Sequence, residues 1–159
     1  MSEFRRICCP IDFSESSRGA LGIAARLART HGAGLTVLHV TGKHFPGEQG
    51  EILPRPHEDR RADTTILSEW TAEAERTAGG TVGSVLLSAP VAEAIVGFAR
   101  DIGSDLIVMS SHGRTGVRRL VLGSVAEAVA RTAPCPVLIV RRDEPEPAAV
   151  EEDQTGMPA

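Results

Sequence analysis

The stretch DLIVMSSHGRTGVRRLVLGSVAEAVARTAPCPVLIV, residues 105–140, decides the fold of this chain. It contains two short apolar runs, Leu106–Met109 and Val137–Val140, and between them Ser124–Thr132 has its apolar residues at helical spacing. Strands that are apolar at every position are typical of parallel sheets covered on both faces. The stretch therefore predicts two parallel strands joined by a right-handed helical crossover.

The same alternation of strands and helices runs through the rest of the chain. The other expected elements are a strand over 5–11, a helix from Ser14 or Ser16 to 31, a strand over 35–40, a helix over 57–77, a strand over 81–87 and a helix over 90–102. Strands that alternate with helices form parallel sheets with helices on both faces. We predict an α/β fold, with one open five-stranded parallel sheet in a single domain over residues 1–142. Ligands of such folds bind beyond the carboxyl ends of the strands.

Composition argues against binding to nucleic acid. Aromatic residues make up 3% of the 159 residues, and single-stranded nucleic acid is bound largely by stacking on aromatic side chains. Six of the 21 acidic residues lie in 143–159, which leaves 15 acidic beside 17 basic residues in the domain. That balance lacks the basic excess of a polyanion-binding protein. The acidic, proline-containing tail 143–159 is expected to be disordered.

Cysteine usage and hydropathy favour a cytoplasmic protein. Cys8, Cys9 and Cys135 are odd in number and form no C-x-x-C pair, so we expect reduced thiols without a disulfide framework or a zinc site. No apolar run approaches the roughly 18 residues of a membrane-spanning helix. The first residues also lack the apolar segment of a secretory signal. We therefore expect no membrane partner.

The loop between the apolar strand at 106–109 and the helix at 124–132 has the composition of a phosphate-binding segment. Gly113 and Gly123 allow positive φ or a close approach of backbone to ligand, and Arg114 supplies a cation. Free N–H groups at the start of the following helix favour an anion. Ser124 and Glu127 also fit a capping box, so Ser124 is either a phosphate contact or the helix N-cap. Neither a Walker A loop nor a dinucleotide fingerprint is present.

Three segments resemble the universal stress protein family. They are ICCPIDFSESSRGAL at 7–21, LTVLHV at 35–40 and the stretch 105–140 quoted above, within a resemblance that covers about residues 4–142. The resemblance implies a fold like that of the adenine nucleotide alpha hydrolases, with strand order 3-2-1-4-5. It also implies a homodimer. Because an exposed apolar edge strand needs a partner, we expect Val137–Val140 to pair antiparallel with the same strand of a second copy.

ATP-binding members of this family carry the motif G-x2-G-x9-G-[ST]. Here Gly113, Gly123 and Ser124 match it, whereas Ser110 stands at the first glycine. By resemblance, the residues expected to contact ATP are Pro10, Ile11, Asp12, Val40, Met109, Ser110, His112, Gly113, Arg114, Gly123, Ser124 and Val125. The first four would lie at the ribose and base, the next three along the nucleotide, and the last five around the phosphates. Mg²⁺ or Mn²⁺ would accompany those phosphates.

Two departures from the family pattern leave two functions open. Serine at 110 costs on the order of 1 kcal/mol if the position requires positive φ, but its hydroxyl can bond the sugar if it does not. Ser88 stands where the family often has the glycine of G-x-P. The chain is then either an ATP-binding stress-response regulator, which acts through its homodimer on an unidentified protein partner, or a dimeric interaction module that binds no nucleotide.

Efficient hydrolysis is not expected, because no general base and no acidic metal pair is evident in the sequence. Any ATPase activity would be slow. Three further residues have simple structural explanations. We expect His39 and Trp70 to lie in the core, and Asp12 to be either a turn residue before the first helix or a ligand contact.

Overall fold

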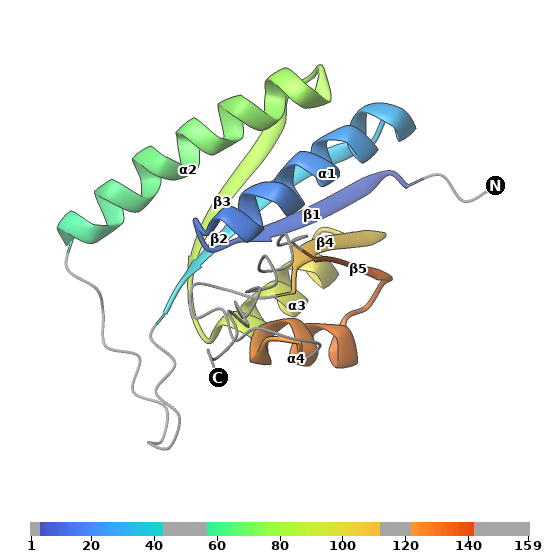
Figure 1. Cartoon of the computed structure of the whole chain (residues 1–159). Helices are drawn as coiled ribbons and strands as arrows, with labels where there is room; N and C mark the ends of the chain where they lie inside the picture. Colours follow the sequence, from blue (N-terminus) through green and yellow to red (C-terminus); the bar gives the residue numbers. More distant parts are fainter. Residues whose placement is uncertain (1–3, 43–56, 112–121, 142–159) are drawn as a thin grey trace, which may run out of the picture.

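The computed structural model describes residues 4–42, 57–111 and 122–141, which form alternating strands and helices (Figure 1). In chain order these are β1 (Arg6–Ile11), α1 (Glu15–His31), β2 (Gly34–Thr41), α2 (His57–Ala78), β3 (Val82–Ser88), α3 (Val91–Asp101), β4 (Leu106–Ser110), α4 (Ser124–Thr132) and β5 (Val137–Val140). Every expected element is present. The acidic tail lies outside the described residues.

The five strands form one parallel sheet in the order β3-β2-β1-β4-β5, as predicted. Strand β1 pairs with β2 over its whole length, from Arg6 to Ile11, but with β4 only at Ile7 and Cys8. Pro10, which has no N–H to donate, lies beyond the last pair with β4. The sheet therefore opens between β1 and β4 at the carboxyl ends of the strands.

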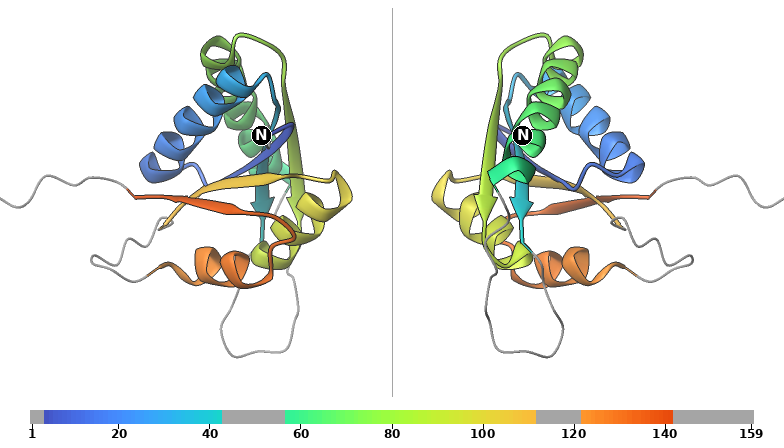
Figure 2. Two further views of the ribbon diagram at one scale, coloured as in Figure 1. Left: turned by 90° about the vertical axis from the view of Figure 1, so that its right-hand side faces the viewer. Right: turned by 90° about the vertical axis from the view of Figure 1, so that its left-hand side faces the viewer.

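Helices cover both faces of the sheet (Figure 2). Helices α1 and α2 lie on one face, and α3 and α4 lie on the other. Alternate residues of β1 enter the two cores, with Cys9 facing α1 and α2 and Cys8 facing α3 and α4. Trp70 of α2 is buried in the first core, as expected. No described helix is long and apolar enough to span a bilayer.

Helix α1 begins and ends where the sequence predicts. Ser14 is its N-cap, and the Ser14 hydroxyl accepts a hydrogen bond from the backbone N–H of Ser17 at 3.1 Å. Gly32 ends the helix with φ of 63°, a left-handed conformation that glycine adopts without steric cost. Ser14 caps the first turn and Gly32 ends the last turn, so these two residues set the length of the helix.

Helix α4 spans Ser124–Thr132 as predicted, but the capping-box expectation is wrong. Its N-cap is Gly123, not Ser124, and glycine has no side chain with which to cap the helix. Gly123 has φ of −59°, so it does not use the positive φ that glycine allows. The cause lies outside the helix. The Gly123 N–H donates to the carbonyl oxygen of Ser111 at 2.7 Å, which fixes the residue before the first helical turn.

The three cysteines are free, as expected. Cys8 and Cys9 are fully buried in β1, and Cys135 is partly buried before β5. Burial, with a smaller contribution from Cys135, raises the pKa of the Cys8 thiol to about 12. These thiols stay protonated near neutral pH, which disfavours a redox role for β1.

Candidate functional site

A cavity of about 340 Å³ opens where the sheet separates, at the carboxyl ends of β1, β2 and β4 and the first turn of α4. This volume lies in the range of small-molecule sites. Nine of the twelve predicted contact residues line it, namely Pro10, Ile11, Asp12, Val40, Met109, Ser110, Gly123, Ser124 and Val125. The other three, His112, Gly113 and Arg114, lie outside the described residues. Strand ends that are distant in sequence thus meet at one place, as parallel topology requires.

Further residues line the cavity that the sequence did not predict as ligand contacts. They are Ser17, Leu38, His39, Thr41, Gly42, Val91, Ile95, Ser111 and Ala126. Thr41 and Gly42 directly follow Val40, a predicted contact residue, at the end of β2. Their place in the sequence could therefore have identified them as lining residues. His39 is buried in the core, as expected, yet it also borders the cavity.

Asp12 is a turn residue before α1, which is one of its two expected roles, and it also lines the cavity. One carboxylate oxygen, Oδ1, accepts a hydrogen bond from the Ser14 N–H at 3.0 Å, which is a turn that precedes α1. The Asp12 N–H lies 3.4 Å from the Ser17 hydroxyl oxygen. The same residue lines the cavity. A turn bonded to the start of α1 therefore forms part of the cavity lining.

Phe13, the next residue, has a strained backbone. Its φ is 62°, and it is the one non-glycine residue with positive φ among those described. For a side chain with a Cβ this conformation costs on the order of 1–2 kcal/mol. Such a conformation persists only where surrounding contacts hold it.

Ser110 fits its position without backbone strain. It is the last residue of β4, pairs with Val140 of β5 and is half-buried. Because its backbone is that of a parallel strand, the expected cost of positive φ does not arise. Ser110 lines the cavity at the position where the family motif has glycine.

Ser88, the second departure from the family pattern, does not line the cavity. It ends β3, is exposed and pairs with Thr41. The next residue is close to the site, because a Cβ placed on Gly42 would lie 2.6 Å from the Ala89 carbonyl oxygen. Gly42 therefore permits a close approach of the segment after β3 to the cavity wall.

The walls of the cavity differ in chemistry. Leu38, Val40, Ile95 and Met109 supply apolar surface, which suits a flat base. Ser124 and Val125, which also line the cavity, begin α4, whose first N–H groups have no partner within the helix. Helix dipole and free donors together favour an anion there. In the described part of the chain, no group of three or more His, Cys, Asp or Glu side chains could hold a metal ion.

Comparison with known proteins gives consistent similarities. A family model described as the Universal stress protein family matches residues 3–141. A universal stress protein of Thermus aquaticus is 35% identical over 139 residues, which cover 87% of this chain and 99% of that protein.

Solved structures agree. The structure of protein MJ0577 of Methanocaldococcus jannaschii superimposes with a TM-score of 0.76 at 28% identity, over 90% of this chain and 99% of that one. A universal stress protein of Archaeoglobus fulgidus, solved in complex with dAMP, has a TM-score of 0.66 at 25% identity, over 87% and 98%.

Proposed function

Since the chain belongs to the universal stress protein family, we propose that it binds ATP in the cavity at the carboxyl ends of β1, β2 and β4. The observation that carries this proposal is the convergence of nine expected contact residues on one cavity that ends at the first turn of α4. The dAMP complex of the Archaeoglobus fulgidus relative supports an adenine nucleotide as the ligand class.

The residues that line the cavity match the base, the ribose and the phosphates of a nucleotide in chemistry. The apolar side chains of Val40 and Met109 would contact the adenine ring, and the Asp12 carboxylate would accept hydrogen bonds from ribose hydroxyls. Backbone N–H groups at Ser124 and Val125 would donate to the phosphates. Gly113 and Arg114 are proposed to complete the phosphate site, and His112 the side of the nucleotide, with Mg²⁺ or Mn²⁺ arriving on the phosphates. Hydrolysis, if any, is slow.

Differential scanning fluorimetry tests the ligand class. At millimolar concentrations, we expect ATP to raise the midpoint of thermal unfolding more than AMP, and GTP to raise it less than ATP. Binding to the folded state alone stabilises it by about 2.7 kcal/mol at a hundred times Kd. Equal shifts by ATP and GTP would contradict recognition of adenine.

We also propose that the protein acts in the cytoplasm as a homodimeric stress-response regulator with a protein partner. The supporting observation is β5, an edge strand on which Leu138 is 39% exposed, the one exposed large apolar side chain among the described residues. Antiparallel pairing with a second β5 would cover it. Light scattering should give a dimer at micromolar concentration, and Leu138→Glu should give a monomer. A monomeric wild type would contradict the dimer.

The alternative function, an interaction module that binds no nucleotide, is favoured by Ser88 and Ser110. The double variant Ser88→Gly/Ser110→Gly separates the two. If only the double variant binds ATP, the serines close the site and the alternative holds. If the wild type binds ATP and the glycines weaken binding, the serine at 110 contributes to the site.

We propose residues 1–142 as the binding unit, so deletion of 143–159 should leave ATP affinity unchanged.

A further inference from the structure

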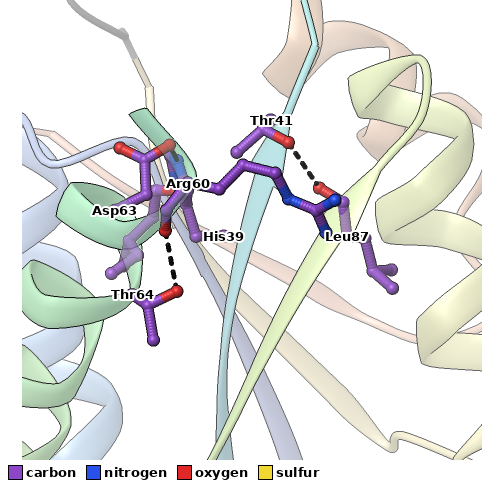
Figure 3. A network of polar contacts seen from close by, with 7 residues as sticks. His39, Thr41, Arg60, Asp63, Thr64 and Leu87 are labelled. Carbon is purple, nitrogen blue, oxygen red and sulfur yellow. Dashed lines mark hydrogen bonds and ion pairs between the residues drawn. The ribbon is translucent and has the colours of Figure 1, made fainter. Parts of the chain in front are cut away.

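His39 lines the cavity and lies close to Asp63 of helix α2 (Figure 3). It is 6% exposed, and its Nδ1 lies 2.8 Å from the carbonyl oxygen of Ile11. A carbonyl oxygen only accepts hydrogen bonds, so His39 Nδ1 carries the proton and donates. The residue bonded in this way is the last residue of β1, directly before Asp12. His39 thus fixes the chain at the point where β1 becomes the turn that lines the cavity.

The imidazole is held from two further sides. Its Nε2 lies 3.9 Å from Oδ2 of Asp63 on α2, and both side chains are buried. The Phe13 ring lies against the imidazole face, with ring centroids 4.1 Å apart and planes at 32°. Trp70 packs edge-on against Phe13 at 5.5 Å. The position of the ring is therefore set by β1, α2 and the turn together.

The turn itself depends on these contacts. Phe13 has φ of 62°, which an isolated segment would not favour. Its ring is held on the core side, between His39 and Trp70, while the preceding residue, Asp12, lines the cavity. Loss of the imidazole removes both a hydrogen bond to Ile11 and the surface on which Phe13 stacks. The Asp12 turn would then relax toward ordinary backbone angles.

We propose that His39 is a positioning residue for nucleotide binding, which holds the Asp12 turn through the Ile11 carbonyl oxygen and the Phe13 ring. This inference rests on the proposed function, because it assigns Asp12 a contact with the ligand. It assigns His39 an indirect role, through the turn, rather than contact with the base.

Two substitutions at position 39 separate positioning from packing. His39→Asn places its amide nitrogen at the same number of bonds from Cβ as Nδ1, so it can still donate to Ile11. His39→Leu fills similar space without a donor. Val37→Ala is the matched control, because Val37 is buried two residues earlier on the same strand and the same face, in the core that α1 and α2 cover.

The first readout needs no ligand. Amide hydrogen exchange reports whether the Ser14 N–H keeps its bond to Asp12 Oδ1. We expect protection of Ser14 to be lost in His39→Leu and kept in His39→Asn and Val37→Ala. Fluorescence of Trp70, the single tryptophan of the chain, should shift in His39→Leu because Phe13 moves against it. Unchanged Ser14 exchange in His39→Leu would overturn the proposal.

The second readout is ATP affinity by calorimetry. His39→Leu should weaken binding about tenfold, which corresponds to one hydrogen bond of about 1.4 kcal/mol, and His39→Asn should restore it to within about threefold of wild type. Val37→Ala should unfold earlier but bind like wild type. Equal losses in the Asn and Leu variants would overturn the proposal. If wild type binds no nucleotide, the proposed function fails and Ser14 exchange alone decides whether His39 holds the turn.

Discussion

The two ends of β1 are built differently. At the amino end, the Arg5 and Arg6 N–H groups donate to the two carboxylate oxygens of Asp105 at 2.7 and 3.0 Å, and the Asp105 N–H donates back to the Arg6 carbonyl at 3.0 Å. At the carboxyl end, pairing with β4 stops at Cys8, Pro10 offers no N–H, and a cavity opens. The same strand is closed at one end and open at the other.

This difference separates stability from binding. Backbone groups at the amino end are bonded to a carboxylate, and such bonds contribute more than bonds between neutral groups. At the carboxyl end, polar residues such as Asp12 and Ser110 line a cavity. We therefore expect substitutions at the closed end to lower the free energy of unfolding without changing affinity for ATP. Substitutions of residues that line the cavity should lower affinity for ATP and leave the free energy of unfolding nearly unchanged.

The largest effect is expected from Ser110→Phe at the open end. A phenyl group at the end of β4 would occupy the cavity, so ATP affinity should fall about 100-fold, or about 2.7 kcal/mol. The free energy of unfolding should change by less than about 1 kcal/mol, because Ser110 is only half-buried at a strand end. Calorimetry and urea denaturation measure the two quantities.

Ser88→Phe is the matched control for this variant, since Ser88 also ends a strand but does not line the cavity. Its ATP affinity should stay within about twofold of wild type. Equal losses of affinity in the two variants would contradict the location of the site.

Asp105→Ala tests the closed end. Loss of the carboxylate leaves two backbone N–H groups without their acceptor, so the free energy of unfolding should fall by about 2 kcal/mol. Affinity for ATP should not change. Asp101→Ala, an exposed position on α3, should cost less than about 0.5 kcal/mol. A loss of affinity in Asp105→Ala at temperatures where the variant is folded would break the separation between the ends.

Ser14→Ala gives a smaller effect at the N-cap of α1, a residue that does not line the cavity. Removing the N-cap hydroxyl leaves the Ser17 N–H without its bond and should lower the free energy of unfolding by about 1 kcal/mol. The backbone N–H of residue 14 still donates to Asp12, so affinity should fall by no more than about twofold. Ser16→Ala, two residues later in the first turn of α1, is the control and should be nearly neutral. Equal losses of stability in the two variants would contradict the cap.

The smallest effect at neutral pH concerns Cys8 and Cys9, in the middle of β1. Burial raises the pKa of Cys8 to about 12 and raises that of Cys9 as well, whereas an unfolded thiol titrates near 8.5. The unfolded state therefore binds fewer protons above pH 8.5, and stability should be fully present below that pH and fall as pH rises toward 12.

Alkylation at pH 8.5 checks this directly. Iodoacetamide should modify the partly buried Cys135 in the folded protein and the other two thiols only after unfolding. Urea midpoints measured from pH 7 to 10 should decrease less steeply in the variant Cys8→Ala/Cys9→Ala. Rapid modification of Cys8 or Cys9 in the native protein would show that β1 is more open than its burial indicates.

Local patterns predicted the elements of this fold to within one residue, because apolar spacing, Ser14 and Gly32 act over a few positions. The rule that ligands bind beyond the carboxyl ends of parallel strands then predicted most of the residues that line the cavity, including Pro10, Val40 and Ser110. Features set by distant contacts were missed. Gly123 rather than Ser124 caps α4, because Gly123 bonds to Ser111.

The contacts of the buried histidine were missed for the same reason. His39 was expected only as a core residue, and its bond to Ile11 joins residues 28 positions apart. The strained φ of Phe13 has no local signal either, since phenylalanine rarely adopts it. Both features depend on α2, which packs against the turn only in the folded chain.

The most direct test of nucleotide binding at the open end of β1 is calorimetric titration of nucleotide-free protein with Mg–ATP, repeated with AMP. The account predicts micromolar affinity for ATP and weaker affinity for AMP, because the outer phosphates would bind at the first turn of α4. Absence of heat at two temperatures, together with no thermal shift at millimolar ATP, would contradict it and favour a module that binds only proteins.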